Sequence, residues 1–98
     1  MIIVHEIFVC KPGNASKLAK MFKEAMAGTP GEHNMIMTDM TGQYNRVIMV
    51  SQYENLTAYE KMAEDMSKDS EQNKKWAEIM KGYTEMYLTG SREIYRVW

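Results

Sequence analysis

The order of two hydrophobic periods along the chain constrains its fold more than any other feature. Residues 2–10 are rich in β-branched and aromatic side chains, which is typical of a strand. The next segment spaces Leu18, Phe22 and Ala25 by three or four residues, as in a helix with one buried face. The strand pattern then returns twice, the helical pattern follows, and a last strand pattern comes after it. The predicted order is strand, helix, strand, strand, helix (with an extra helix), strand.

Turn and capping residues predict where these elements begin and end. Gly28 and Pro30 are expected to terminate the first helix. Gly82 weakens the last helix, so we expect irregular backbone between Gly82 and Gly90. The side chains expected to cap helix N-termini are Asn14, Asn55 and either Asp69 or Ser70. The expected strands span 2–10, 34–41, 46–53 and 92–98, and a turn at 42–45 joins the middle pair as an antiparallel hairpin.

This order of elements is that of the ferredoxin-like βαββαβ sheet, an α+β fold. A right-handed crossover after the first strand places both main helices on one face of the sheet. A length of 98 residues allows one hydrophobic core, so we expect a single domain over residues 1–98.

Both faces of the predicted sheet carry apolar side chains. On the first strand the two alternating sets are Ile3, His5, Ile7 and Val9 against Val4, Glu6, Phe8 and Cys10. Alternation alone does not say which set faces the helices. An exposed apolar sheet face is an association liability, so we expect a second copy to pack on it, giving a two-fold homodimer. The alternative is a semi-polar face that water covers.

Composition excludes several classes of function. The formal net charge of −1 and the lack of a basic run argue against nucleic acid and anionic membranes as partners. A single cysteine and two histidines make a disulfide or a structural zinc site unexpected. No apolar run approaches the ~20 residues that cross a bilayer, and the first residues do not resemble a signal peptide. We therefore expect a cytoplasmic protein without a metal.

The eleven methionines are the unusual feature of the composition. Methionine is flexible and polarisable, so an excess of it is compatible with a binding cavity that adapts to its ligand. It is equally compatible with a core filled by an easily tolerated residue. Composition does not separate these two interpretations.

Glu6 and His5 are the candidate catalytic residues. Glu6 lies between Val4 and Phe8 on one strand face, so in a cavity it could act as an acid or base. Alternatively it forms a structural cross-strand ion pair with Arg92 or Arg96 of the last strand. Because the first and last strands are expected to lie apart, Arg46 is the closer partner. His5 could act as a general base or make one hydrogen bond at the edge of the core.

The candidate ligand-binding residues are methionine, aromatic and small polar side chains on the strands and near the last helix. Tyrosines before the last strand could stack on an aromatic ligand at a cavity mouth, or could pack the helix end onto the sheet. The full candidate set is Phe8, Met37, Asp39, Met49, Ser51, Tyr83 and Tyr87.

Several segments in order resemble NIPSNAP-type domains. They are Lys11-Pro12-Gly13, the hairpin from Gly42 to Val47, Tyr53-Glu54-Asn55-Leu56, the segment around Trp76 and Ile79, and the closing strand around Ile94. The resemblance covers essentially the whole chain. It implies the dimeric α+β barrel superfamily, which also holds antibiotic-biosynthesis monooxygenases, haem-degrading enzymes and muconolactone isomerases.

Function varies widely on that fold, so the resemblance leaves more than one hypothesis. The first is a NIPSNAP-like homodimer that binds a small, flat, apolar or aromatic ligand and needs no cofactor. The alternative is a cofactor-independent monooxygenase or isomerase acting on aromatic or polyketide-like substrates. A protein–protein adaptor is the third. Haem degradation is not expected, because haem-degrading relatives use a first-strand asparagine and a later histidine, and no histidine follows His33.

Overall fold

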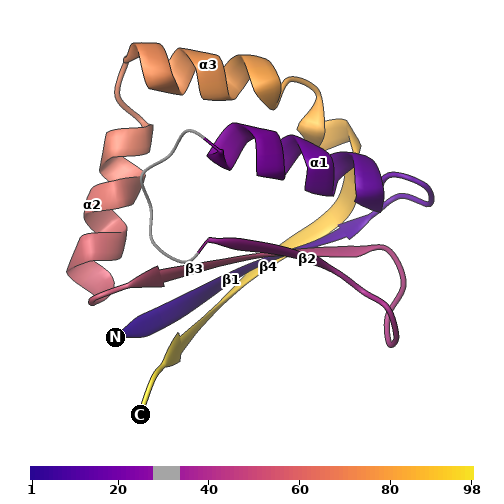
Figure 1. Cartoon of the computed structure of the whole chain (residues 1–98), viewed down its shortest axis with the longest axis horizontal. Helices are drawn as coiled ribbons and strands as arrows, with labels where there is room; N and C mark the ends of the chain where they lie inside the picture. The colour runs from indigo at the N-terminus through magenta and orange to yellow at the C-terminus, as the bar shows by residue number, and fades with distance from the viewer. Residues whose placement is uncertain (28–33) are drawn as a thin grey trace.

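The computed structural model describes residues 1–27 and 34–98 and contains one four-stranded antiparallel sheet (Figure 1). The strands are β1 (Ile2–Cys10), β2 (Met35–Thr38), β3 (Arg46–Tyr53) and β4 (Tyr87–Arg96). The helices are α1 (Ala15–Met26), α2 (Leu56–Met66), α3 (Glu71–Ile79) and the short 3₁₀ helix η1 (Tyr83–Glu85). The strand order β2-β3-β1-β4 confirms the predicted ferredoxin-like α+β fold. Gly28, Pro30 and His33 lie outside the described residues.

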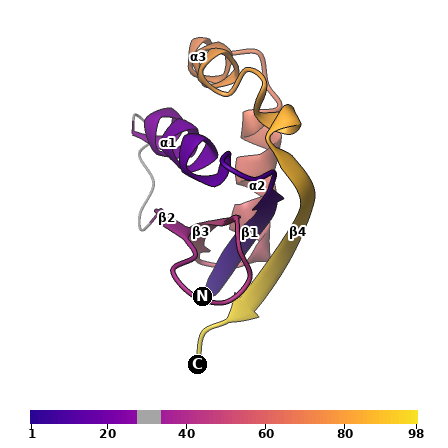
Figure 2. The ribbon, with the colours of Figure 1, turned by 90° about the vertical axis from the view of Figure 1, so that its right-hand side faces the viewer.

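The helices lie on one side of the sheet, in two levels (Figure 2). Helix α1 lies over the sheet and α3 lies further out, above α1, while α2 stands at the end of β3 and connects the sheet to α3 (Figure 1). None of the helices in the described part of the chain is long and apolar enough to cross a membrane.

Two of the predicted helix caps are present. The Asn55 side chain accepts a hydrogen bond from the backbone N–H of Ala58 at 2.9 Å, and Ser70 Oγ accepts one from Asn73 at 3.1 Å. Ser70, rather than Asp69, is therefore the cap of α3. Asn14 precedes α1, but its side chain makes no cap bond.

The predicted irregular segment between Gly82 and Gly90 is correct only as far as Met86. Gly82 adopts a left-handed conformation (φ 84°), η1 follows, and β4 already begins at Tyr87. The strand starts early because the hydrogen-bonding edge of β1 continues to Cys10, which pairs with Tyr87 after a register shift between Val9 and Cys10. The expectation that the first and last strands lie apart is also wrong, because β4 pairs with β1 along almost its whole length.

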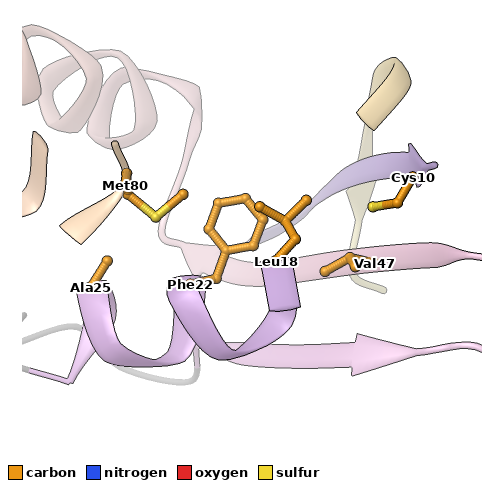
Figure 3. Close-up of a cluster of buried hydrophobic side chains, with 6 residues drawn as sticks. All are labelled: Cys10, Leu18, Phe22, Ala25, Val47 and Met80. Atoms are coloured by element: carbon orange, nitrogen blue, oxygen red, sulfur yellow. The ribbon is translucent and has the colours of Figure 1, made fainter. Parts of the chain in front are cut away.

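The core lies between α1, the sheet and the chain after α3 (Figure 3). Its buried side chains are Cys10, Leu18, Phe22, Ala25, Val47 and Met80. Val4 and Val47 are fully buried, so the strand faces that carry them are the ones that the helices cover. The set Val4, Glu6, Phe8 and Cys10 thus points inward. The set with Ile3, His5 and Ile7 points to the other face, which nothing in the described residues covers.

Candidate functional site

A cavity of about 420 Å³ lies between the inner face of the sheet and the helices α2 and α3. The sheet contributes residues from β1, β3 and β4. Helix α2 contributes most of the helical lining, and α1 and α3 contribute Met26 and Trp76. The lining residues are Glu6, Met26, Asn34, Met49, Ser51, Gln52, Tyr53, Tyr59, Met62, Ala63, Met66, Trp76 and Arg92. Most of this lining is apolar or aromatic, with one charged pair.

The charged pair is formed by Glu6 and Arg92, which are direct cross-strand partners on β1 and β4. Glu6 Oε1 accepts a hydrogen bond from Arg92 Nε at 2.6 Å and a second from the hydroxyl of Tyr59 at 3.3 Å. The Glu6 side chain is 17% exposed, whereas that of Arg92 is 55% exposed. The carboxylate is therefore held inside the cavity, and the guanidinium lies at its open side.

Aromatic rings hold this pair in place. The guanidinium carbon of Arg92 lies 5.6 Å from the centre of the Tyr59 ring, within the range of a cation–π contact. Tyr53 contacts Tyr59 edge to face, with ring centres 5.2 Å apart. The Tyr59 ring thus supports the guanidinium while its hydroxyl donates to the carboxylate.

The two groups around Glu6 have raised pKa values. Burial, followed by the negative charge of Glu6, raises the pKa of the Tyr59 hydroxyl, so this residue stays protonated and donates at neutral pH. The hydrogen bond to Glu6 raises the pKa of Arg92, so its positive charge is kept. At neutral pH Tyr59 is therefore a hydroxyl donor, and Arg92 is a guanidinium cation, on either side of Glu6.

Some methionines line the cavity, and at least one is a core residue. Met26, Met49, Met62 and Met66 line the cavity, whereas Met80 is buried in the core. Flexible thioether side chains on several walls let the cavity adapt its shape to a ligand.

The structure divides the candidate residues among different places. Glu6, Met49 and Ser51 lie in the cavity. His5 lies on the opposite face of the sheet, where its ring contacts Tyr95 at 5.3 Å. Because neighbouring residues on a strand point to opposite faces, His5 and Glu6 cannot act together on one ligand in this cavity. Met37 pairs with Ile48 on the uncovered face as well.

Arg46 is not the partner of Glu6, contrary to the prediction. It lies opposite Val9, and its backbone N–H donates to Asp39 Oδ1 at 2.8 Å. Asp39 thus holds the hairpin between β2 and β3 and does not line the cavity.

Phe8, Tyr83 and Tyr87 form an aromatic cluster beside the core. Phe8 contacts Tyr87 with ring centres 5.0 Å apart and Phe22 at 5.2 Å, and Tyr83 lies 6.0 Å from Tyr87. These rings pack the chain after α3 onto the sheet, which was the alternative to a ligand-stacking role.

The sequence prediction missed four residues that line the cavity: Tyr53, Tyr59, Trp76 and Arg92. Tyr59 and Trp76 are at inward-facing helical positions, so periodicity could have found them as a pair of aromatic residues on one face. Arg92 was considered as an ion-pair partner of Glu6, but the expected strand order favoured Arg46, whereas β4 in fact pairs with β1.

A second, larger depression of about 900 Å³ lies between α1 and α3. Much of its lining is exposed and charged or polar, including Glu24, Glu71, Lys74 and Lys75. Within residues 1–27 and 34–98, no three His, Cys, Asp or Glu side chains lie close enough together to hold a metal ion.

The fold and the cavity define a class: an antiparallel ferredoxin-like α+β protein with a mostly apolar cavity between its sheet and helices. Several solved structures have the same fold. A NIPSNAP domain protein from Burkholderia xenovorans has a TM-score of 0.80 at 13% identity and covers 100% of this chain and 95% of its own. A NIPSNAP family protein from Agrobacterium tumefaciens has a TM-score of 0.78 at 14% identity, with 97% and 90% covered.

A structure of an antibiotic biosynthesis monooxygenase is also similar, with a TM-score of 0.67 at 11% identity and 100% and 99% of the two chains covered. No family model matches the sequence, and no curated protein is significantly similar to it. The resemblance to NIPSNAP-type domains is thus confirmed as a shared fold, and at these identities the fold is what the likeness establishes.

Proposed function

We propose that the protein is a homodimer that binds a small, flat, largely apolar aromatic compound in the cavity between the sheet and α2 and α3. The observation that carries this proposal is the cavity itself, with apolar and aromatic walls and the Glu6–Arg92 pair at one side. Its volume falls within the ~300–1,000 Å³ that is usual for small-molecule sites.

The ring-bearing walls indicate the shape of the ligand. Tyr53, Tyr59 and Trp76 reach the cavity from β3, α2 and α3, and methionines fill the space between them. Aromatic rings stack on flat ligands, and thioethers contact them favourably. A planar compound of one to three fused rings matches this lining.

The uncovered sheet face supports the dimer. Ile3, Ile7, Ile48 and Val50 lie side by side there, and Met35 is 55% exposed beside them. A second copy placed face to face across a two-fold axis would bury this apolar surface. Light scattering at micromolar concentration tests the dimer, and a monomeric mass contradicts it.

Native mass spectrometry of the freshly purified protein tests ligand binding. We expect an additional mass that is lost on denaturation. The variant Ala63→Phe, which fills the cavity from α2, should abolish this mass. The matched control is Ala77→Phe on the exposed side of α3, outside the cavity. No bound compound in the wild type, together with no binding of any aromatic probe, favours an adaptor protein instead.

A second candidate function is a cofactor-independent monooxygenase or isomerase acting on aromatic or polyketide-like substrates. The observation that favours it is a carboxylate inside the cavity, in a fold shared with antibiotic biosynthesis monooxygenases. Glu6 would remove a proton from an activated methylene group. One atom of O₂ then becomes the new carbonyl oxygen and the other leaves as water with both methylene hydrogens, so the substrate supplies all of the electrons.

Oxygen uptake with hydroxylated naphthacenes measures this activity. Glu6→Gln should remove it, whereas Glu78→Gln, the same change at an exposed position of α3 outside the cavity, should leave it unchanged. Uptake that is equal in wild type and Glu6→Gln contradicts an enzymatic role for this carboxylate.

A further inference from the structure

The Glu6–Arg92 pair satisfies only part of the hydrogen-bonding capacity of its two groups. Both bonds to the carboxylate end on Oε1, and among the described residues Oε2 has no partner. Arg92 donates through Nε alone, so its terminal amino groups also have no partner in this part of the chain. The site therefore keeps an acceptor and a fork of donors side by side.

These unused atoms are accessible. The Arg92 side chain is 55% exposed. Among the described residues that are not exposed, no fully buried side-chain oxygen lacks a hydrogen-bond partner, so Glu6 Oε2 is not sealed in the protein interior. Both residues line the same cavity. Arg92 Nε lies 2.6 Å from Glu6 Oε1, so the unused carboxylate oxygen and the unused amino groups belong to two groups in direct contact.

The pair is also fixed before a ligand arrives. Direct cross-strand register places Glu6 opposite Arg92, the Tyr59 hydroxyl holds the carboxylate, and the Tyr59 ring lies against the guanidinium. Preorganised groups lose little conformational entropy when they bind a ligand. The fixed pair can therefore discriminate among ligands by the positions of their oxygen atoms.

Charge decides which oxygens the site accepts. Glu6 neutralises Arg92, so the pair carries no net charge. A ligand carboxylate that approached Arg92 would also come close to Glu6 and be repelled by it. A neutral ligand whose hydroxyl donates to Glu6 Oε2, while the adjacent oxygen accepts from Arg92, satisfies both groups without repulsion.

We propose that this site selects neutral aromatic compounds with two adjacent oxygens, as in a catechol, and discriminates against aromatic carboxylates. Glu6 accepts from one hydroxyl and Arg92 donates to its neighbour. This selectivity rests on the proposed binding of an aromatic ligand in the cavity, and it assigns the two charged residues as the ones that determine specificity.

Calorimetric titration at neutral pH with three naphthalene probes tests the selectivity: the diol with adjacent hydroxyls, the mono-hydroxyl compound and the carboxylate. We expect the diol to bind roughly tenfold more tightly than the mono-hydroxyl compound, since each lost bond to a charged group weakens binding by about this factor. The carboxylate should bind most weakly. A carboxylate that binds as tightly as the diol overturns the proposal.

The variant Glu6→Gln should move two affinities in opposite directions. Binding of the diol falls, and binding of the carboxylate rises because Arg92 then has no neutralising partner. A misfolded variant would lower both. Arg92→Met should lower binding of the diol without improving that of the carboxylate, and Glu78→Gln at an exposed position of α3 outside the cavity should change neither.

The experiments distinguish failure of the ligand-binding proposal from failure of the selectivity proposal. If none of the three probes binds, both proposals fail. If all three bind with equal affinity and Ala63→Phe abolishes this binding, ligand binding in the cavity stands and the selectivity is wrong.

Discussion

The coupling between Glu6 and Arg92 can be measured as a contribution to the free energy of unfolding. The perturbation is a double-mutant cycle with Glu6→Gln, Arg92→Met and the double variant. Arg92 Nε lies 2.6 Å from Glu6 Oε1, and 86 positions separate the two residues in sequence. The interaction therefore exists only in the folded protein, and its loss shows fully in an unfolding experiment.

The expected magnitude follows from burial. Ion pairs that are exposed on both sides contribute about 0.2–1 kcal/mol, whereas loss of one partner of a fully buried pair costs about 3–5 kcal/mol. Glu6 is 17% exposed and Arg92 is 55% exposed, so the pair lies between these limits. Solvent around Arg92 screens the attraction, and we expect a coupling of about 1–2 kcal/mol.

Urea unfolding, followed by circular dichroism, measures the four proteins of the cycle. The matched control is the pair Lys68–Asp65 on α2 and the turn after it, with an N–O distance of 3.1 Å and exposures of 69% and 54%. Its coupling should be at most about 0.5 kcal/mol and should vanish in molar salt. A Glu6–Arg92 coupling no larger than that of the control would refute the assignment of a partly buried, preorganised pair.

Three further predictions concern burial and ionisation. Leu18 is fully buried against the sheet, so Leu18→Ala should lower the free energy of unfolding by about 3 kcal/mol in a urea titration, and a loss below about 1 kcal/mol would contradict its central place in the core. Because the pKa of Tyr59 is raised in the folded state, its bond to Glu6 stabilises the protein below the ordinary tyrosine pKa of about 10 and is lost as pH rises through the folded value. An ultraviolet titration should therefore show part of the tyrosine absorbance change above the ordinary pKa of about 10, and Tyr59→Phe should reduce this late phase. Burial raises the pKa of the Cys10 thiol, so it should react slowly with a disulfide reagent in the native protein and rapidly in urea; equal rates would contradict its burial.

Local patterns in the sequence predicted the elements well. The period of apolar residues identified β1, β3, α1 and α2, and short-range hydrogen bonds explain why Asn55 could be assigned as a cap. Both signals depend on residues within a few positions of each other. Residues 87–90 were predicted incorrectly as irregular, because their strand conformation depends on pairing with the distant β1 edge.

The site was harder to predict, and Glu6 illustrates why. The residue was correctly suspected to be near a cavity or an ion pair, since alternation placed it between Val4 and Phe8. Its partner was assigned to Arg46 from an incorrect idea of which strands are neighbours. Strand order is a property of the whole sheet, and no short stretch of sequence contains it.

The sequence by itself determined the order of strands and helices, the caps of α2 and α3, and the fold class, because these follow from side-chain period and local hydrogen bonding. Only the tertiary structure decided which sheet face the helices cover. That choice separates Glu6 from His5 and brings Arg92, from the last strand, to the first. Contacts of this kind depend on long-range strand register, where a shift of one residue would turn every side chain to the opposite face.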